Sequence, residues 1–369
     1  MIKRTFLSPP TIFPSVHEQM NVFWREGYIS TTGPHIERFE NEMNVLFEKE
    51  GNVTLALNSA TSAIHLGLKN LDVQAGDMVL CQSLNFIACV NPILYQQAVP
   101  VFIDSEKESW NMDPEQLIQA IDYCLGMGRK PKAVIAVHIY GMPFKIKEIR
   151  SIADSYQIPL LEDAAEALGS KYDNIPVGGF GDQSVFSFNG NKIISAAGGG
   201  VLISKLKPQR DRAKFWSTQS KEDAKGYLHK EVGYNYRISN IQAAIGVGML
   251  PHLEELVSDR RRIFEQYKSA LEQLIDFQPE ALGARSNRWL TAGLCANEDL
   301  RDKVIQKLEE HGIEARPVWR PMHVQPLCKD MKFFGSGVAE DLWKRGICLP
   351  SGYGLDPSPI IKIVKEVLG

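Results

Sequence analysis

The sequence predicts an α/β fold built on a mostly parallel sheet that helices cover on both faces. Short apolar runs rich in β-branched residues alternate with amphipathic stretches of helical spacing over the first two thirds of the chain. The runs are apolar at nearly every position, which is typical of strands that are buried on both faces. The chain has 369 residues, of which 44% are hydrophobic and 23% charged, so it has room for a large domain and a smaller one.

Seven of the apolar runs are expected to form the strands of this sheet. They are residues 53–57, 77–81, 100–104, 133–137, 158–162, 184–188 and 200–204. Helices are expected between them, and one begins at Pro114 behind Asp113, a residue type that caps helix N-termini. The last two strands should be neighbours. A sheet with helices on both faces is a three-layer sandwich.

The pattern changes in the last third of the chain. One long helix or two, with a break near Pro251, is expected over residues 238–274. Strand-like and helical stretches then mix, and the chain ends in a helix over residues 359–368. We therefore predict a large domain over residues 13–248 and a small α+β domain over residues 249–369, with residues 1–12 associated with the small one.

Composition and charge exclude several classes of protein. The net charge is −3 without a basic stripe, which argues against a nucleic-acid partner. No apolar run reaches the roughly 18 residues of a membrane span, and the first residues do not form a signal peptide. The six cysteines form no CxxC pair and the eight histidines have no metal-ligand spacing, so we expect a cytoplasmic protein with reduced thiols and no metal.

Ligands of open α/β sheets bind at the carboxyl ends of the strands, so polar residues that follow the expected strands are candidates for a site. These residues are Asn58–Ser62, Gln82–Phe86, Asp104, His138–Gly141, Asp163–Ser170 and Asn189–Lys192. They bring hydroxyl residues at a helix start, an aromatic side chain, two acids and a lysine to one edge of the sheet.

Each of these signals has an ordinary structural alternative. The hydroxyl residues around Thr61 are interpreted as a phosphate site at the positive end of a helix. The structural alternative is that Ser59 is a plain N-cap. Asp163 pairs with a buried cation, such as a protonated ring nitrogen, or caps a helix. Lys192 is a surface lysine, or an amine whose pKa is lowered so that it reacts as a nucleophile. Phe86 belongs to the core or stacks on a ligand.

Taken together, a lysine, an acid, an aromatic residue and a phosphate-binding helix start are the set that binds pyridoxal phosphate. The motifs also resemble the sugar aminotransferases of the DegT/DnrJ/StrS family over nearly the whole chain. The residues that carry the resemblance are Ile29–Pro34, Ser59–Leu68, His138–Gly141, Glu162–Gly169, Gly178–Asp182, Ser187–Gly200, Gly233–Asn240 and Pro321–His323. The resemblance implies a fold type I transferase, pyridoxal phosphate as cofactor, and a homodimer with active sites at its interface.

The resemblance also implies roles for individual residues. Lys192 matches the lysine that forms the Schiff base with the cofactor, and Asp163 matches the acid that pairs with the pyridine nitrogen. The other implied cofactor contacts are Glu166 near the ring hydroxyl, Phe86 on the ring, Ala60, Thr61 and Ser187 at the phosphate, and Asn235 at the phosphate of the neighbouring subunit. Ala60 departs from the family pattern, because many members carry Gly there.

Further motifs resemble the aminotransferases of UDP-bacillosamine-type pathways. They are Asn189–Lys192, Phe215–Gln219, Arg285–Leu290, Arg316–Trp319 and Gly346–Gly352. This resemblance implies amino transfer from L-glutamate to C4 of UDP-2-acetamido-2,6-dideoxy-4-keto-glucose. A GDP-linked perosamine precursor or another nucleotide sugar stays an open alternative. Such substrates need cations, and the candidates are Arg237, Arg316, Arg320 and His323, unless these are surface or domain-interface charges.

Three other functions agree less well with the sequence. Relatives that dehydrate sugars resemble a version in which the lysine is replaced, commonly by His, whereas Lys192 is present. A cofactor-binding protein without turnover has no need of Lys192, Asp163 and Asn235 together. A dinucleotide-binding oxidoreductase carries GxGxxG after its first strand, whereas Gly178–Gly181 lies late and precedes no helix. We therefore expect an enzyme, an aminotransferase.

Overall fold

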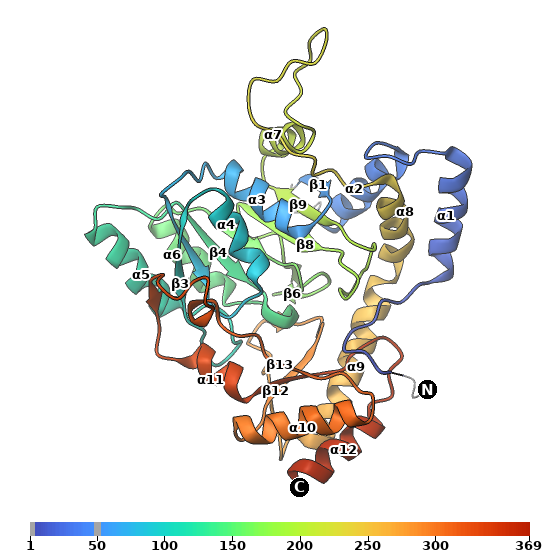
Figure 1. The fold of residues 1–369 in the computed structure, drawn as a ribbon, viewed down its shortest axis with the longest axis vertical. Coiled ribbons are helices and arrows are strands. Elements are labelled where there is room, and N and C mark those ends of the chain that lie inside the picture. Colours follow the sequence, from blue (N-terminus) through green and yellow to red (C-terminus); the bar gives the residue numbers. More distant parts are fainter. Residues whose placement is uncertain (1–3, 48–52) are drawn as a thin grey trace.

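The computed structural model describes residues 4–47 and 53–369, and its centre is an eight-stranded sheet (Figure 1). The strand order is β1 (Val53–Leu57), β9 (Gly200–Ser204), β8 (Gln183–Ser187), β5 (Leu160–Asp163), β4 (Ala133–Val137), β2 (Met78–Gln82), β3 (Val99–Ile103) and β14 (Phe333–Phe334). Strands β8, β5, β4, β2, β3 and β14 are parallel, and β9 is antiparallel to both of its neighbours. The predicted, mostly parallel sheet is thus confirmed.

All seven expected strands are present, within a few residues of their expected bounds, and β8 and β9 are neighbours. The eighth strand was not expected. β14 is only two residues long and comes from the C-terminal third of the chain, where it pairs with β3 at the sheet edge. A two-residue strand carries no periodicity, so the sequence alone does not reveal it.

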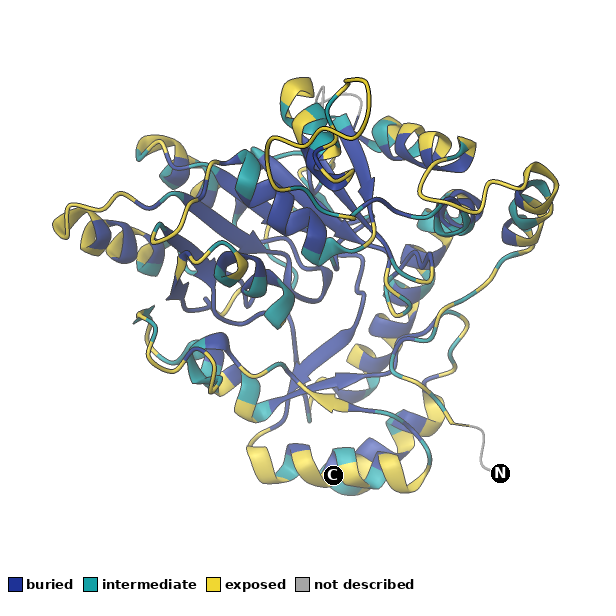
Figure 2. Ribbon diagram, turned by 45° about the horizontal axis from the view of Figure 1, so that its top comes forward, coloured by how far each residue is buried: buried dark blue, intermediate teal, exposed yellow. Residues whose placement is uncertain are grey.

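Alternate residues of each strand pack on opposite faces of the sheet. Within β4, Val134 and Ala136 belong to one hydrophobic cluster, while Ala133 and Ile135 belong to another. Both clusters are buried, which explains why the strands are apolar at nearly every position. The central sheet is accordingly buried along its length (Figure 2).

Helices supply the outer layers of the sandwich. One cluster includes residues of α2 (Pro34–Leu46), α5 (Pro114–Gly126), α6 (Ile146–Ser155) and α8 (Asn240–Met249). The other includes residues of α3 (Ala60–Asn70), α4 (Asn91–Tyr95) and α7 (Lys207–Ser217). Helix α1 (Pro14–Glu26) packs along α8. Asp113 caps α5 as predicted, because its side chain accepts a hydrogen bond from the backbone of Glu115.

A second, four-stranded antiparallel sheet lies in the last third of the chain. Its order is β10 (Asp276–Phe277), β12 (Thr291–Leu294), β15 (Gly346–Leu349) and β13 (Arg316–Pro317). Its helices are α9 (Leu253–Leu271), α10 (Glu298–Glu310), α11 (Val338–Arg345) and α12 (Ser358–Leu368). A short 3-10 turn at Leu250–His252 separates α8 from α9, so the expected break near Pro251 is confirmed.

Two contacts bear on the predicted division into domains. Thr5 pairs with Ile313, so the segment before α1 lies beside the second sheet. Two further elements join the two parts of the chain. One is strand β14, and the other is a third small sheet of β11 (Ala284–Arg285), β6 (Lys171–Tyr172) and β7 (Ile175–Pro176). The boundary at residue 249 stays a prediction. Within residues 4–47 and 53–369, no helix has the length and apolar character to cross a membrane.

Candidate active site

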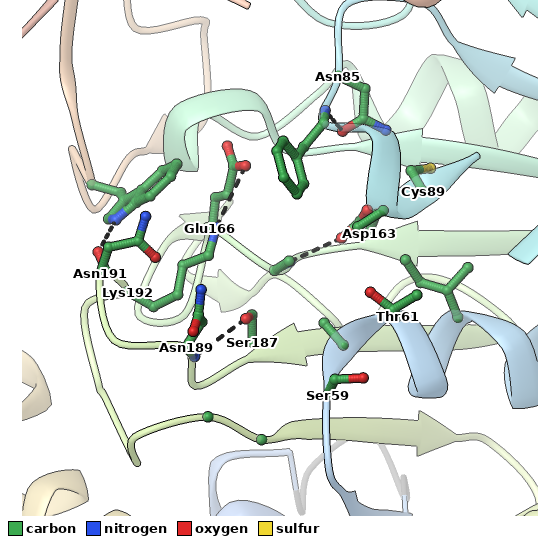
Figure 3. A pocket seen from close by; sticks show the side chains of 18 of the residues that line it. Ser59, Thr61, Asn85, Cys89, Asp163, Glu166, Ser187, Asn189, Asn191 and Lys192 are labelled. Atoms are coloured by element: carbon green, nitrogen blue, oxygen red, sulfur yellow. Dashed lines mark hydrogen bonds and ion pairs between the residues drawn. The ribbon is translucent and has the colours of Figure 1, made fainter. Parts of the chain in front are cut away.

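A cavity of about 350 Å³ lies at the carboxyl ends of the parallel strands (Figure 3). Its wall combines the start of α3, the segment after β2, the end of β5, the loop after β8 and two tryptophans from the C-terminal third. The predicted site residues that line it are Ala60, Thr61, Phe86, Asp163, Glu166, Ser187 and Lys192. Residues from six separate segments thus meet where the sheet rule places a ligand.

Lys192 extends into this cavity and lies between an acid and an aromatic ring. Its Nζ is 3.6 Å from Glu166 Oε1 and 3.8 Å from the centre of the Trp289 ring. The Lys192 side chain is only 13% exposed, which overturns the surface-lysine alternative. Burial lowers the pKa of Lys192, and the charges of Glu166 and Asp163 oppose that effect.

The loop that carries Lys192 is shaped by the glycines that follow it. Phe188 accepts backbone hydrogen bonds from Ala196 and Gly198, which folds the loop back on itself. At the start of β9, a Cβ on Gly200 would lie 2.4 Å from the backbone of Ser59 and Ala60. Because Gly200 has no Cβ, it allows β9 to lie closer to the start of α3 than a residue with a side chain would allow.

Asp163 ends β5 with its side chain 5% exposed. It accepts a hydrogen bond from the backbone N–H of Ala165 at 3.1 Å, and turns follow it rather than a helix. The interpretation of Asp163 as a helix cap is therefore wrong. Burial raises the pKa of Asp163, while the Ala165 N–H and the charge of Lys192 lower it. A buried carboxylate of this kind favours a cationic partner.

The start of α3 points its free backbone N–H groups toward the cavity. Ser59 is the N-cap, because its Oγ accepts a hydrogen bond from Ser62 N at 3.1 Å. The cap alternative is thus confirmed for Ser59, and it leaves Ala60 and Thr61 in the first turn beside the cavity. The first N–H groups of a helix have no partner within it, so a helix start and an anion site coexist here.

Glu166 faces Lys192 from the turn after β5. Its Oε2 accepts a hydrogen bond from the backbone N–H of Tyr140 at 2.6 Å. Burial raises the pKa of Glu166 to about 7, and the charge of Lys192 works in the opposite direction. Glu166 therefore changes protonation near neutral pH beside the amine, a position suited to proton exchange.

Aromatic side chains close one side of the cavity. Phe86 is 54% exposed and its ring lies 5.4 Å from that of Trp319. The Phe86 side chain therefore belongs to the cavity wall and not to the core. Trp319 is fixed through its backbone N–H, which donates to the Tyr140 hydroxyl at 3.0 Å, and Trp289 donates its indole N–H to Asn191 O.

Several lining residues were given no role from the sequence. Asn85 was among the polar residues expected after the second strand but received no function, and Cys89 was not considered. Trp289 and Trp319 belong to the motifs at residues 285–290 and 316–319, and only the folding of distant segments onto the sheet brings them to the cavity that holds Lys192. The side-chain amide nitrogen of Asn85 is buried without a hydrogen-bond partner among the described residues. An unpaired buried donor at a cavity wall fits a site that takes a polar ligand.

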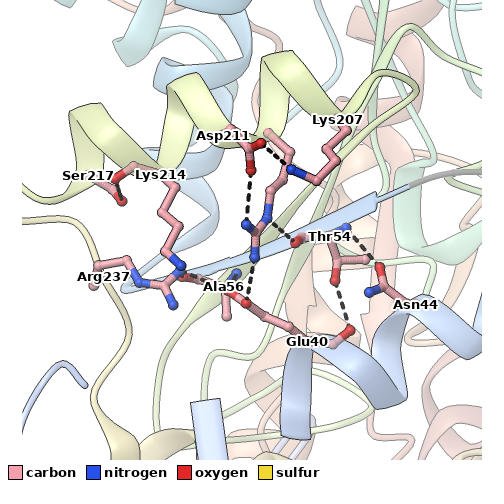
Figure 4. A network of polar contacts seen from close by, with 10 residues as sticks. Glu40, Asn44, Thr54, Ala56, Lys207, Asp211, Lys214, Ser217 and Arg237 are labelled. Carbon is pink, nitrogen blue, oxygen red and sulfur yellow. Dashed lines mark hydrogen bonds and ion pairs between the residues drawn. The ribbon is translucent and has the colours of Figure 1, made fainter. Parts of the chain in front are cut away.

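Arg237 does not line the cavity, contrary to its predicted role in substrate binding. Its Nη1 lies 2.8 Å from Glu40 Oε1 and donates to Ala56 O at 2.8 Å (Figure 4). Through Nη1 the guanidinium holds α2 against β1, so we correct the assignment to a structural one. Asn235 is exposed and also lies outside this cavity, with its backbone oxygen bonded to Asn58.

The other predicted substrate cations also lie outside the cavity. His323 stacks on Phe333, and its Nδ1 lies 2.6 Å from Ser83 Oγ, so it ties the segment after β13 to the end of β2. Arg320 is exposed and lies over the Trp343 ring. Arg316 is exposed and pairs with Glu314. None of the three lines the cavity that holds Lys192, and their predicted roles stay proposals.

Comparison with known proteins places the chain in a family. Residues 14–368 match the model of the DegT/DnrJ/EryC1/StrS aminotransferase family. The chain belongs to this family. EpsN of Bacillus subtilis, to which the activity of a pyridoxal phosphate-dependent aminotransferase is attributed, is 44% identical over 100% of this chain and 96% of its own length. The family aminates sugars with pyridoxal phosphate, so the predicted family, cofactor and enzyme class are confirmed.

Two further relatives bear on fold and substrate. GDP-perosamine synthase of Escherichia coli O157:H7 is 35% identical over 97% of this chain and 96% of its own length. The crystal structure of a DegT DnrJ EryC1 StrS aminotransferase from Brucella abortus aligns with a TM-score of 0.90 at 27% identity. That alignment covers 96% of this chain and 95% of the other. The α/β architecture is therefore that of the family's aminotransferases.

The residues at the cavity fit pyridoxal phosphate. The phosphate would lie at the start of α3 with Thr61 and Ser187, and the ring would lie between Phe86 and the end of β5. Asp163 would pair with the ring nitrogen, which supplies the cationic partner that its buried carboxylate needs. The methyl group of Ala60 is accommodated, since Ala60 has helical conformation as the first residue of α3.

Proposed function

We propose that this enzyme moves the amino group of L-glutamate to C4 of a nucleotide-linked 4-keto-6-deoxy sugar, with UDP-2-acetamido-2,6-dideoxy-4-keto-glucose as the first candidate acceptor. The observation that carries the proposal is the buried Lys192 amine, with Asp163 and Glu166 around it in one cavity. The motifs at residues 285–290 and 316–319 resemble those of UDP-sugar aminotransferases and support the choice of nucleotide.

Pyridoxal phosphate supplies an aldehyde that takes up amino groups and a ring that accepts the electrons of a breaking C–H bond. Lys192 is the base of the proposed mechanism, because burial lowers its pKa and so favours the neutral amine. In the first half of the reaction its Nζ would take the proton from Cα of glutamate and give it to the cofactor carbon that carries the nitrogen, and in the second half it would move a proton in the reverse direction, to C4 of the sugar. Glu166, at 3.6 Å from Nζ, would hold or return that proton.

Asp163 and the aromatic wall have supporting roles in this proposal. The carboxylate of Asp163 would keep the ring nitrogen protonated, an electrostatic contribution of the kind worth several kcal/mol in preorganised sites. Trp289, 2% exposed, covers the amine and keeps water from it. Removing water strengthens the interactions of Lys192 with Glu166 and Asp163.

A second acceptor has specific support. A GDP-linked 4-keto-6-deoxymannose is the alternative, because GDP-perosamine synthases of three bacteria are 32–35% identical to this chain. That identity extends over most of the chain but does not single out residues that touch the nucleotide. The two acceptors therefore have to be compared directly.

The test uses the two halves of the reaction separately. We expect L-glutamate to bleach the yellow enzyme, and UDP-2-acetamido-2,6-dideoxy-4-keto-glucose to restore the colour while mass spectrometry detects the amino sugar. Restoration only by the GDP-linked sugar would move the assignment to the alternative acceptor. An enzyme that glutamate does not bleach would contradict the proposed donor.

A further inference from the structure

The amine of Lys192 lies over the face of an indole ring. Its Nζ is 3.8 Å from the centre of the Trp289 ring, well inside the roughly 6 Å within which an aromatic face attracts a cation. Every other lysine that lies over a ring in the described part of the chain is at 4.6 Å or more. Tryptophan is also the aromatic residue that attracts cations most strongly. The contact therefore has the geometry of a close cation–π interaction.

Burial makes this contact different from one at the surface. Lys221 lies over Tyr227 at 4.6 Å, but that ring is 87% exposed and water screens the charge. The Trp289 side is 2% exposed and the Lys192 side chain 13% exposed. A cation–π interaction stabilises more strongly when both partners are removed from water. The ring is thus a substantial source of stabilisation for a positive charge on Lys192.

The indole is fixed relative to the amine by the residue that precedes Lys192. The indole N–H of Trp289 donates to Asn191 O at 2.6 Å, and Ser8 Oγ donates to the same oxygen at 2.7 Å. Both hydrogen bonds act on the backbone of the loop that carries the lysine. The ring and the amine therefore keep a defined separation, and the interaction is preorganised.

A buried arginine holds the backbone of Trp289. Arg260 is 2% exposed, and its Nη1 donates to Trp289 O at 2.8 Å and to Ser351 O at 3.0 Å. Its Nη2 donates to Ser8 Oγ at 3.2 Å, whereas its Nε has no partner and no carboxylate lies within ion-pair distance among the described residues. A charge buried without a counter-charge costs free energy. The position of Trp289 is maintained in spite of that cost, which core packing alone does not explain.

The ring complements Glu166, the other close neighbour of the amine. Glu166 lies 3.6 Å from Nζ and also favours a positive charge there (Figure 3). Its carboxylate competes for the same proton, however, because burial raises the pKa of Glu166 to about 7. The face of an indole attracts the ammonium but cannot accept its proton. Trp289 therefore stabilises the protonated amine whether or not Glu166 is ionised.

We propose that Trp289 is a further catalytic residue, whose indole face binds the ammonium of Lys192 while the amine carries a proton between the two carbon atoms of each half-reaction. Arg260 is the positioning residue that holds this ring in place. The inference rests on the proposed function, in that it takes Lys192 to be the amine that moves the proton.

The test measures the pKa of Lys192 directly in protein loaded with pyridoxamine phosphate, which has no aldehyde and leaves the lysine amine free. Lysines are labelled with ¹³C at Cε and titrated by NMR, and the Lys192 signal is the one missing from Lys192→Ala. Tryptophan is replaced by analogues with increasing numbers of fluorine atoms, which nearly keep the shape of the ring but weaken its negative face. We expect the pKa of Lys192 to fall stepwise, by about one pH unit in total.

Two variants labelled with the same analogues are the controls. In Trp289→Phe the pKa of Lys192 should be lower than in wild type and should no longer respond to fluorine. Trp319→Phe removes a tryptophan of the same cavity, 6.2 Å from the Trp289 ring, and should keep the wild-type response. A pKa that ignores fluorine in wild type, or a response that persists in Trp289→Phe, would overturn the proposal.

A comparison without fluorine covers the case in which the most substituted protein does not fold, as melting temperatures will show. Phe at position 289 keeps a weaker aromatic face, whereas Leu has none, and both are apolar. The pKa of Lys192 should be lower in Trp289→Leu than in Trp289→Phe, and the reverse order would contradict the proposed role of the ring. These titrations use neither glutamate nor a nucleotide sugar, so a wrong donor or acceptor leaves their outcome unchanged.

Discussion

The amine of Lys192 is held where burial and charge act in opposite directions. Burial favours its neutral form, while Glu166 and Asp163 favour the ammonium. An amine with this balance can gain and lose a proton within one catalytic cycle, which an exposed lysine with its usual pKa near 10 does rarely at neutral pH. The short loop before the three glycines therefore carries the lysine for a chemical and not a structural reason.

Replacement of Lys192 is the direct check of this assignment. Lys192→Ala should retain pyridoxal phosphate through its phosphate and ring contacts but lose at least about a thousandfold in turnover, because nucleophile and base are both removed. Lys205→Ala, at a lysine that is 42% exposed and paired with Asp182, should behave like wild type. Turnover of Lys192→Ala close to that of the control would refute the assignment.

Glu166 gives the site a pH dependence of its own. Its pKa rises to about 7 on folding, from 4.5, so between these values the folded protein binds a proton that the unfolded chain releases. The stability from this group is fully present below pH 4.5 and is lost as the pH rises through about 7. In cofactor-free protein, wild type should lose up to about 3 kcal/mol of unfolding free energy relative to Glu166→Gln over this window.

Melting curves of the two cofactor-free proteins from pH 4.5 to 7.5 provide the measurement. The amide of Glu166→Gln has the same shape and still accepts the hydrogen bond from Tyr140, so the comparison isolates the ionisation. A difference in melting temperature that does not change with pH would show that Glu166 keeps its ordinary pKa.

The elements of the fold differ in how far the sequence predicts them. Strands β1 to β5 and β9 are largely buried and mainly apolar, so each is visible without any tertiary information, whereas the apolar signal of β8 (Gln183–Ser187) comes from Val185 and Phe186 with the following Phe188. The residues at their carboxyl ends follow from the same rule, which is why Asp163 and Lys192 could be placed in advance. The prediction succeeds where one element and its immediate continuation decide the structure.

The rest of the site depends on contacts between elements far apart in sequence. Trp289 and Trp319 reach the cavity that holds Lys192 only because the C-terminal third folds back on the sheet. Arg237 was assigned to the substrate because its charge suggested an anion, whereas Glu40, 197 residues away, is that anion. No local pattern indicates such a partner, so the sequence could not distinguish a structural arginine from a binding one.

The link between α2 and β1 makes a prediction about stability. Glu40 pairs with Arg237 at 2.8 Å and with Arg210 at 3.0 Å, and its Oε1 also accepts from Ala56 N. Glu40→Ala leaves the buried Arg237 without a carboxylate and Arg210 with Asp211 alone, and it should cost about 3–5 kcal/mol. Arg237→Ala should cost less, because Arg210 still neutralises Glu40.

Urea unfolding of the three proteins checks this order. Glu42→Ala, on the same helix and in the solvent-exposed pair with Arg38, is the matched control and should change stability by at most about 1 kcal/mol. Equal losses in Glu40→Ala and Arg237→Ala would mean that Arg210 contributes nothing to the network.

One loop of the molecule has the exposed apolar side chains of a contact surface. A loop that follows α7 projects from the body of the protein, and it carries the exposed apolar side chains of Tyr227, Leu228 and Val232 (Figure 1). Exposed apolar side chains gathered on one loop mark a contact surface. Asn235, at the base of this loop, is exposed and does not line the cavity of its own chain. Both observations support the proposal of a homodimer in which Asn235 reaches the phosphate site of the partner.

Mixed dimers decide whether the active site is built from two chains. Lys192→Ala and Asn235→Asp should each be inactive alone, the second because a carboxylate would repel the phosphate of the cofactor. In a dimer with one chain of each kind, the intact Lys192 of one chain meets the intact Asn235 of the other, so one site is complete. Co-expression should therefore restore roughly a quarter of wild-type activity by random pairing of subunits. If Asn235 served its own chain, both sites of the mixed dimer would be defective, and the mixture would stay as inactive as its two parents.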